Sequence, residues 1–533
     1  MIPGVSWPLQ GWRRRLAVIL GALAAGGLAA VAHPPFGFLP GLLGYALLLG
    51  LVDRADGARP LRSAFWRGWL AGFAYFLIGC WWVAEAFLVD ARQAWMAPFA
   101  ASLLPAGLGL FWGAAAALYR KIAPGHVGRV AVFAASLALF EWLRGHVLTG
   151  FPWNLPGETW AAGGAVSQFA SVVGAYGLTV LTLFAAAAFA PLASNEDRRR
   201  RIAMAAAGLA VIAGLWAWGA ARLSAAKPSD TALMVRIVQP YVPQRDKWTQ
   251  AAFDGIAHRY FALTAMPSET GRTPDLVIWP EGALPASTQQ LLAEDAWTAE
   301  AMAEALKPGQ TLLMGTYREH IAPGEGVDYF NSLLALRHGR DGRLAVVGTY
   351  DKHRLVPFGE FLPLEPLAEA IGLKELVHVG DGFSLGPRPR PMTLPGLPSF
   401  QPLICYESLF PELSNTGERP AFLVNISNDA WFGMTSGPRQ HLNLASYRAI
   451  EQGAPILRAT PTGVSAVIDP WGRTSRDRTL VAGERGVIDA PLPARLENTY
   501  FSRIGDGGFW VFTALGLLVA VPWGRLRRAA LSK

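Results

Sequence analysis

Cysteines and charged side chains are both scarce in this sequence. Its 533 residues contain two cysteines, Cys80 and Cys405, which excludes the disulfide framework of a small secreted domain. Charged residues make up 16% of the chain and hydrophobic residues 52%, and the mean hydropathy is +0.26. So low a content of charge excludes an ordinary soluble protein. No internal repeat stands out either, which excludes a repeat architecture.

The apolar residues gather into runs long enough to cross a bilayer, which takes about 20 residues. They fill roughly the first 220 residues and recur near the C-terminus. The second run is short and rich in glycine, and the fifth carries Glu141 and Arg144. Alanine and glycine are frequent within the runs, as in closely packed membrane helices. The sequence predicts eight spans, near 16–33, 37–53, 66–88, 95–119, 129–149, 165–193, 202–222 and 507–523.

Basic residues cluster in every second loop between these runs. Cytoplasmic loops of membrane proteins carry such clusters, so we expect both termini in the cytoplasm and the residues between the seventh and eighth spans outside it. In a bacterium that side is the periplasm, and we expect the first helix to stay uncleaved. The net charge of +8 lies mostly in these clusters and needs no nucleic acid to explain it. The clusters are Arg13 to Arg15, Arg54 with Arg59, Arg62 and Arg67, Arg120 with Lys121 and Arg129, Arg198 to Arg201, and Arg525 with Arg527 and Arg528.

Residues 228–494 have the composition of a soluble domain. Helical stretches, such as 248–266, 298–306 and 440–452, separate short β-rich runs, which favours an α/β fold. The β-rich runs are 232–239, 275–279, 311–316, 332–337, 344–349, 400–405, 422–426, 456–459 and 464–468. The sequence thus predicts a transmembrane domain of seven spans over 1–227, a periplasmic domain over 228–494, and a last span with a cytoplasmic tail over 495–533.

Three of the strands end at residues that can carry chemistry. Glu281 follows Leu276-Val-Ile-Trp-Pro280, Lys352 follows the strand at 344–349, and Cys405 closes a strand that begins near Phe400. Ligands of α/β sheets bind beyond the carboxyl ends of strands, so these side chains can converge. A thiol, a carboxylate base and an ammonium that stabilises an oxyanion are sufficient for acyl transfer through a thioester.

Each of these residues also has a plain structural explanation. A free cysteine is often a buried core residue, a glutamate can cap a helix, and a lysine is most often a solvated charge. Glu360 and Glu407 can be salt-bridge partners of nearby arginines. The spacing of 71 residues from Glu281 to Lys352, and of 53 more to Cys405, does not by itself bring the groups together.

Several motifs of the chain resemble a known family. Residues 228–494 resemble the nitrilase (carbon–nitrogen hydrolase) superfamily, and the whole chain, with its spans, resembles the bacterial apolipoprotein N-acyltransferases. The motifs are Phe151-Pro-Trp-Asn-Leu155, Trp279-Pro-Glu281, Lys352 with Val356-Pro-Phe-Gly-Glu360, Cys405-Tyr-Glu407, Asn425-Ile-Ser-Asn-Asp-Ala-Trp-Phe-Gly433 and Gly437-Pro-Arg-Gln-His441. The resemblance implies an α-helical transmembrane bundle joined to an α-β-β-α sandwich.

The resemblance also implies a reaction and roles for residues. Glu281 would be the general base, Lys352 the oxyanion-stabilising group and Cys405 the nucleophile, with Glu360 and Glu407 positioning the triad and the incoming amine. The reaction would move the sn-1 acyl chain of a phospholipid, preferably phosphatidylethanolamine, to the α-amino group of the diacylglyceryl-cysteine of an apolipoprotein. No metal or organic cofactor is implied. Further candidates for substrate positioning are Tyr406, Trp248 and Trp153, although an interfacial belt or a core explains the tryptophans as well.

The chain departs from the family pattern at three places. Met434 stands where the family often has an acidic or polar residue, Pro461-Thr-Gly463 where it often has Asn-Asn-Gly, and Arg439 where it has tryptophan. None of the three is a member of the expected triad, so the departures concern the substrate groove.

Two other functions remain open from the sequence. A membrane-anchored amidase would use the same three residues, but one or two spans suffice for an anchor. A transporter or scaffold would place ionisable groups within its spans, and here Glu85, Glu141 and Arg144 are the few that lie well inside them. We expect an acyltransferase that works as a monomer in the bacterial inner membrane, with its catalytic domain on the periplasmic face.

Overall fold

The computed structural model describes residues 11–521 except positions 56, 126, 226–228, 246, 248–249, 322–325 and 363–381. The chain divides into two compact units. The helical unit comprises residues 1–84, 98–226 and 504–533, and the α/β unit comprises residues 85–97 and 227–503.

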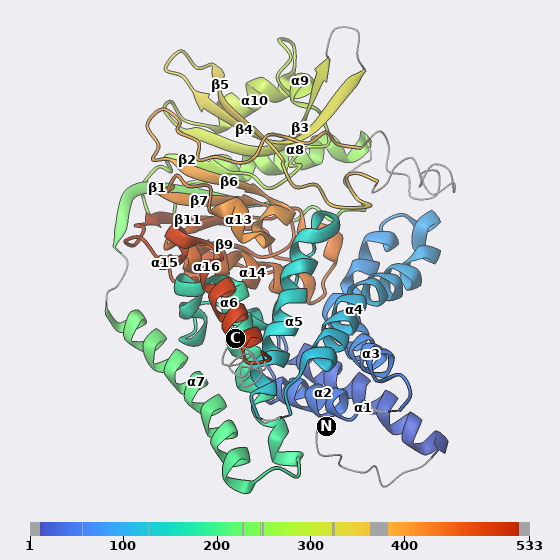
Figure 1. The fold of residues 1–533 in the computed structure, drawn as a ribbon. Helices are drawn as coiled ribbons and strands as arrows, with labels where there is room; N and C mark the ends of the chain where they lie inside the picture. The colour runs from blue at the N-terminus through green and yellow to red at the C-terminus, as the bar shows by residue number, and fades with distance from the viewer. Residues whose placement is uncertain are drawn as a thin grey trace, which may run out of the picture. The chain divides into compact units, whose positions relative to one another are not determined.

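The helical unit consists of α-helices joined by turns and by short 3₁₀ helices (Figure 1). Its α-helices are α1 (Gly11–Val31), α2 (Leu43–Asp53), α3 (Pro60–Cys80), α4 (Ala97–Ile122, whose first residue belongs to the α/β unit), α5 (Arg129–His146), α6 (Ala170–Ala187), α7 (Arg198–Ala225) and α16 (Gly507–Leu518). Its 3₁₀ helices are η1 (Leu39–Leu42), η4 (Val147–Thr149), η5 (Pro156–Thr159), η6 (Val166–Phe169) and η7 (Ala190–Ala193), and η2 (Trp81–Leu88) begins in it.

Glycines let these helices approach one another closely. A Cβ on Gly26 of α1 would overlap the carbonyl oxygen of Ala71 in α3, and a Cβ on Gly219 of α7 would overlap the carbonyl oxygen of Ala165. Only glycine fits at such contacts, which is how membrane helices gain packing where lipid offers no hydrophobic gain. The glycine and alanine bias of the sequence therefore reflects the helix interfaces.

The prediction of eight spans was wrong in number. Among the described residues, six helical segments are long and apolar enough to cross a membrane: Gly11–Val31, Pro60–Leu88, Ala91–Ile122, Arg129–Thr149, Val166–Ala193 and Arg198–Ala225. The predicted second and eighth spans contain the shorter helices Leu39–Asp53 and Gly507–Leu518. At about 1.5 Å per residue, such helices are shorter than the roughly 30 Å of a hydrocarbon core.

The short α2 packs along one half of α1. Gly41 lies beside Leu28, Gly44 beside Ala25, and Leu51 beside Gly21, so the two helices run in opposite directions. Because α1 extends ten residues beyond Gly21 to Gly11, α2 returns along only part of its length. Hydropathy reflects the apolar composition of α1 and α2 but not the shorter length of α2.

The charged residues of the fifth span form an internal pair. Glu141 and Arg144 are fully buried in α5 and joined by a salt bridge one helical turn apart. Arg144 also donates to the carbonyl oxygens of Phe151 and Trp153, and Glu141 accepts a hydrogen bond of 2.6 Å from Trp112 Nε1. These contacts give the pair a structural role in the helical unit.

The α/β unit contains eleven described strands. Its elements are β1 (Asp230–Gln239), α8 (Gln250–Ala265), β2 (Leu276–Ile278), α9 (Thr288–Leu291), α10 (Trp297–Ala305), β3 (Thr311–Ile321), β4 (Val327–His338), β5 (Leu344–Asp351), β6 (Phe400–Ile404), η8 (Cys405–Leu409), α13 (Pro411–Ser414), β7 (Phe422–Ile426), η9 (Asp429–Phe432), α14 (Gly437–Gln452), β8 (Ile456–Ala459), β9 (Ser465–Ile468), η10 (Arg476–Arg478), β10 (Thr479–Leu480), β11 (Gly486–Pro493) and α15 (Tyr500–Ile504). It also holds the end of η2, with η3 (Ala91–Met96). Each predicted strand is present, and β10 and β11 are additional.

The strands form two sheets. The six-stranded sheet has the order β11-β1-β2-β3-β4-β5, and the five-stranded sheet has the order β10-β9-β8-β7-β6. In each sheet three neighbouring strands are parallel, namely β1-β2-β3 and β6-β7-β8, and the outer pairs are antiparallel. Most residues of the parallel strands are apolar and buried, as the sequence predicted for several of them.

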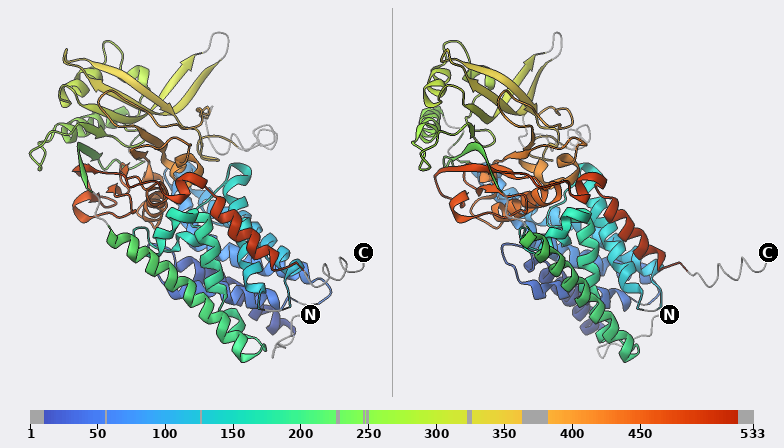
Figure 2. Two further views of the ribbon diagram at one scale, coloured as in Figure 1. Left: turned by 60° about the vertical axis from the view of Figure 1, so that its left-hand side comes forward. Right: turned by 90° about the vertical axis from the view of Figure 1, so that its left-hand side faces the viewer.

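A common core lies between the two sheets. It joins Ile237 and Ile278 of the six-stranded sheet to Ile404, Val424 and other residues of the five-stranded sheet. A second core packs α8 and α10 on the outer face of the six-stranded sheet. Helices α13 and α14 lie against the five-stranded sheet (Figure 1), and Figure 2 shows the α/β unit from two further sides. This is the predicted α-β-β-α sandwich.

Candidate active site

Cys405 occupies a strained position where β6 turns into η8. Its φ angle is +50°, in the left-handed region that a residue with a Cβ rarely adopts. The carbonyl oxygen of Cys405 accepts hydrogen bonds from Ser408 Oγ (3.0 Å) and from His441 Nε2 (3.3 Å). These contacts hold the turn, and the thiol-bearing residue is 8% exposed. Such strain typically marks a functional residue in a rigid surrounding.

Glu281 reaches the same place from the carboxyl end of β2. Its Oε1 accepts hydrogen bonds from Asn331 Nδ2 (2.7 Å) and Lys352 Nζ (3.2 Å), and its Oε2 accepts one from the backbone N–H of Asn428 (2.7 Å). The carboxylate also interacts with the Cys405 thiol by a hydrogen bond. Glu281 therefore joins the six-stranded sheet to the loop that follows β7 of the other sheet.

Lys352 follows directly after β5 and is almost fully buried. Its Nζ lies 3.2 Å from Glu281 Oε1 and 2.8 Å from Glu360 Oε1. The three predicted side chains, Glu281, Lys352 and Cys405, thus come together from β2 and β5 of one sheet and β6 of the other. An ammonium has three N–H donors, so these two contacts leave a third donor for a further acceptor.

The charges of the site oppose ionisation of the thiol at rest. Burial and the neighbouring Glu281 carboxylate raise the pKa of Cys405 well above its ordinary 9.0, although Lys352 acts in the opposite direction. Burial alone would raise the pKa of Glu281, but the Lys352 charge and the hydrogen bonds from Asn331 and Cys405 outweigh it and hold the pKa below 4.5. Burial would lower the pKa of Lys352, but Glu281 and Glu360 raise it. The resting site holds a carboxylate, an ammonium and a neutral thiol.

The two other predicted acids differ in their surroundings. Glu360 shares Lys352 and Asn331 with Glu281, since Asn331 Nδ2 also lies 2.8 Å from Glu360 Oε1. Glu360 Oε2 accepts a hydrogen bond of 2.8 Å from the backbone N–H of Val356. This acid therefore belongs to the charged cluster around Lys352.

Glu407 instead ties two segments of backbone together. It is fully buried, and it accepts hydrogen bonds from Tyr350 Oη (2.7 Å) and from the backbone N–H groups of Ile404 (2.7 Å), His353 (2.7 Å) and Arg354 (3.1 Å). Burial raises its pKa above 4.5, even though these hydrogen bonds act in the opposite direction. Glu407 fixes the turn of Cys405 against the segment that carries Lys352.

The aromatic candidates are placed differently from one another. Tyr406, next to the thiol on η8, is buried and packs edge-on against Phe410 at 5.0 Å between ring centroids. Trp153 lies in the helical unit, where it is 1% exposed and packs against Trp82 at 4.4 Å. Trp248 lies outside the described residues.

A second buried network supports Cys405 from the side of the five-stranded sheet. Asp429 accepts hydrogen bonds from Ser427 Oγ (2.7 Å) and Arg458 Nη2 (2.7 Å), and it lies 2.9 Å from His441 Nδ1. His441 reaches the carbonyl oxygen of Cys405 with its other ring nitrogen. The sequence motifs contained Asp429 and His441, but their spacing assigned neither of them a role.

Sequence reasoning missed two other residues of the site. Asn331 lies within β4, where a polar side chain is ordinary, and its signal was only its place in a largely apolar strand. Lys247 lies in the polar stretch Gln244-Arg-Asp-Lys247 after β1, yet it is 4% exposed. Its Nζ lies 3.1 Å from the position that a Cβ would take on Gly282, next to Glu281.

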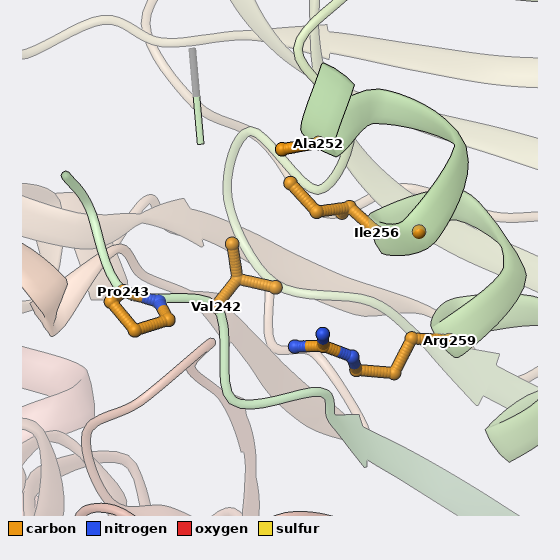
Figure 3. Close-up of a pocket in the computed structure, with 6 residues that line it drawn as sticks. Val242, Pro243, Ala252, Ile256 and Arg259 are labelled. Carbon is orange, nitrogen blue, oxygen red and sulfur yellow. The ribbon is translucent and has the colours of Figure 1, made fainter. Parts of the chain in front are cut away.

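A pocket of about 160 Å³ lies near this loop, between the residues after β1 and helix α8. Figure 3 shows Val242 and Pro243 on one side and Ala252, Ile256 and Arg259 of α8 on the other. The Arg259 guanidinium donates to the carbonyl oxygen of Tyr241 at 2.7 Å. The pocket contains no member of the triad and is smaller than an ordinary ligand site, so it is not the active site.

Comparison with known proteins covers nearly the whole chain. Residues 25–188 match the apolipoprotein N-acyltransferase N-terminal domain, and residues 236–500 match carbon-nitrogen hydrolase. The chain is 53% identical over 514 residues to the apolipoprotein N-acyltransferase of Caulobacter vibrioides, covering 96% of this chain and 95% of that protein. It is 40% identical over 527 residues to the enzyme of the same name from Rhodopseudomonas palustris, with coverage of 96% and 95%. The chain therefore belongs to the apolipoprotein N-acyltransferase family, and it is a multi-pass membrane acyltransferase of lipoprotein maturation with a nitrilase-like domain.

Proposed function

We propose that the protein transfers an acyl chain from the sn-1 position of a phospholipid to the α-amino group of the diacylglyceryl-cysteine of an apolipoprotein. Phosphatidylethanolamine is the expected donor, and the transfer completes the maturation of the lipoprotein. The convergence of Glu281, Lys352 and the strained Cys405 is the observation that supports this proposal. Nucleophile, base and cation are then held in one place before substrate binds.

The first half-reaction forms a thioester. Cys405 Sγ attacks the ester carbonyl carbon while Glu281 takes the thiol proton. The third N–H of Lys352 stabilises the oxyanion, a contribution of about 10²–10³ in rate for one such donor. The bond from the carbonyl carbon to the glycerol oxygen breaks, and Glu281 returns its proton to that oxygen. A lysophospholipid leaves, and the acyl chain stays on Sγ.

The second half-reaction passes the chain to the amine. The α-amino nitrogen attacks the thioester, Lys352 again stabilises the oxyanion, and Glu281 transfers a proton from the nitrogen to Sγ as the carbon–sulfur bond breaks. The products are an amide and the free thiol. Because one site serves two acceptors in turn, we expect ping-pong kinetics. Glu360 supports the charge of Lys352, and Tyr406 and Trp248 are proposed to position substrate beside the thiol.

Both substrates are anchored in the lipid bilayer, which suits a protein of this composition. Burial of an acyl chain contributes about 0.8 kcal/mol per CH₂ group, so a groove at membrane level favours both of them. We propose a membrane domain over 1–227, a catalytic domain over 228–494 on the periplasmic face of a bacterial inner membrane, and a C-terminal helical segment over 495–533. The basic clusters of the sequence support this location.

Intact mass spectrometry tests the proposal directly. The purified protein is incubated with phosphatidylethanolamine, and we expect one acyl group to be added. Cys405→Ala abolishes the adduct, whereas Cys80→Ala, at a thiol buried in α3, keeps it. A diacylated lipopeptide discharges the adduct, and water or ammonia does not. Discharge by water or ammonia would instead indicate an amidase, and a wild-type protein that forms no adduct with accessible lipid would sink the transferase proposal.

A further inference from the structure

The second half-reaction leaves one proton to be disposed of. An α-amino group has a pKa of about 8, so the acceptor arrives at neutral pH mainly as an ammonium. It loses one proton to become a nucleophile and a second when the amide forms. The thiol takes back only one of these. If the proposed function holds, a further group must therefore receive the remaining proton.

Lys247 is a buried amine close to the expected base. Its loop joins the site through Gln244, whose Oε1 accepts a hydrogen bond of 3.0 Å from Asn428 Nδ2, and the backbone N–H of the same Asn428 binds Glu281 Oε2. The Nζ of Lys247 lies beside Gly282, the neighbour of the expected base. Gly282 has a φ of +53° and no side chain, which leaves room for that ammonium.

We propose that Lys247 acts as a second base, specific to the amine half-reaction, which receives through Glu281 the proton that the acceptor ammonium gives up. In this step Glu281 takes the first proton from the ammonium and hands it to neutral Lys247. The amine attacks the thioester carbon, and Glu281 then carries the second proton from nitrogen to Sγ as the carbon–sulfur bond breaks. Lys247 leaves the step as an ammonium and later returns its proton to water.

The surroundings of Lys247 suit a base that works near neutral pH. Burial lowers its pKa from 10.5 to about 8, although the Glu281 charge acts in the opposite direction. Glu281 in turn contacts Lys352 and the Cys405 thiol, and Lys352 contacts Glu360. On its own loop the charged neighbour Arg245 donates to the carbonyl oxygen of Leu88 at 2.9 Å.

The other titratable groups of the site are less able to receive the proton. Lys352 is bound to two carboxylates that raise its pKa. His441 has Asp429 on one ring nitrogen and the Cys405 carbonyl on the other. Glu281 is occupied with the proton that returns to sulfur. A hydrolase that uses water as its acceptor releases no such proton from nitrogen, so the second base distinguishes a reaction with an ammonium acceptor.

The test separates the two half-reactions. Acyl-enzyme is formed with phosphatidylethanolamine, freed of lipid, and discharged with a diacylated lipopeptide at about pH 6.5, 8 and 9.5, while intact mass follows the thioester. The variants are Lys247→Met, which removes the base, and Lys247→Arg, which keeps a charge but cannot release its proton. Lys307→Met, at an exposed lysine after α10, is the matched control. Hydroxylamine, an uncharged nucleophile at neutral pH, serves as an acceptor without a surplus proton.

We expect Lys307→Met to form the acyl-enzyme within about twofold of wild type, and both Lys247 variants to lose more in lipopeptide discharge than in acyl-enzyme formation. Discharge by the lipopeptide at pH 8 slows by about tenfold to a hundredfold in both Lys247 variants, the range for loss of a general base. The difference in discharge rate between wild type and the Lys247 variants narrows at the lower pH, because Lys247 is then protonated in wild type. It also narrows at the higher pH, because the amine is then already neutral. Discharge by hydroxylamine is unchanged, as is every rate of Lys307→Met.

Three results would overturn the role of Lys247. They are unchanged lipopeptide discharge in Lys247→Met, wild-type discharge in Lys247→Arg, and an equal loss of acyl-enzyme formation in the Lys247 variants. The first would show that the amine arrives neutral, the second that charge alone matters, and the third that Lys247 serves the whole site. Absence of an adduct in the wild type would instead defeat the proposed function itself, so the two failures are distinguishable.

Discussion

Each unit of the protein buries a carboxylate beside a cation, and the two pairs behave differently. In the helical unit, Glu141 and Arg144 lie one turn apart on a single helix, and every nitrogen of the Arg144 guanidinium donates to an acceptor in the same unit. In the α/β unit, Glu281 and Lys352 come from separate strands, and Lys352 keeps a third donor beside a strained thiol. Burial of an ion pair therefore does not mark a catalytic site; unused hydrogen-bonding capacity beside a nucleophile does.

The same substitution in the two acids gives the sharpest test of this difference. Glu281→Gln removes the proton acceptor but leaves Lys352 paired with Glu360, so we expect a folded protein. Acyl-enzyme formation should fall by about 10²–10⁴, the usual contribution of a general base. Intact mass gives the rate, and thermal unfolding in detergent gives the stability. Full activity of this variant would remove Glu281 from the role of base.

Glu141→Gln should produce the opposite result. It leaves the buried Arg144 without its counter-ion, a change that costs about 3–5 kcal/mol when a buried pair is broken. We expect a lower melting temperature and a smaller yield of folded protein. The protein that does fold should form the acyl-enzyme at the wild-type rate. A loss of rate without a loss of stability would mean that the Glu141 pair takes part in the reaction.

Within the α/β unit, Glu407 and Glu360 extend the comparison to smaller effects. Glu407→Gln places an amide N–H₂ among four donors, and an unsatisfied buried polar group costs about 1–3 kcal/mol. We expect a lower melting temperature with the rate of folded enzyme little changed.

Glu360→Gln removes a charge from Lys352, so we expect acyl-enzyme formation to slow by about tenfold, within the 1.5–3 kcal/mol of a charged hydrogen bond, with stability little changed. A slower rate without a loss of stability in Glu407→Gln, and a loss of stability without a slower rate in Glu360→Gln, would reverse the roles that the contacts suggest.

The sequence was informative where a reactive residue ended an apolar strand, and less so elsewhere. Glu281, Lys352 and Cys405 could be predicted because each follows a strand, and strand ends meet. Asn331 could not, because a polar residue within a strand ordinarily faces solvent, and only the fold turns it toward two carboxylates. Lys247 stands in a polar stretch that has the composition of an exposed loop, and burial of that loop is a tertiary event.

The helical unit shows the same boundary between composition and geometry. Hydropathy correctly located the long spans, but it measures apolar content and not the length of a helix, so α2 and α16 were predicted to be spans. Trp153, a candidate for substrate positioning, lies in the interior of the helical unit against Trp82, and its role stays a prediction. The lengths of α2 and α16 depend on packing between helices that are far apart in sequence.

The pH dependence of stability gives the smallest expected effect, and it contrasts Asp429 with Glu407. Burial would raise the pKa of Asp429, but the charges of Arg458 and His441 outweigh it and hold the pKa below 3.8. The folded protein thus binds this proton less tightly than the unfolded chain does. Its contribution to stability is complete above about pH 4 and is lost as the pH falls through the lowered pKa.

Glu407, whose pKa is raised above 4.5, has the opposite sign: its contribution weakens as the pH rises from its ordinary pKa to the raised one. Asp429→Asn should therefore be less stable than wild type at pH 7 but lose less stability between about pH 5 and pH 3. In Glu407→Gln, stability should depend less on pH above about pH 4.5, and its dependence at lower pH should be unchanged. Melting temperatures in detergent across this range measure both. If the melting temperature of Asp429→Asn falls with decreasing pH as steeply as that of wild type, other carboxylates, Glu281 among them, cause the acid sensitivity of the α/β unit.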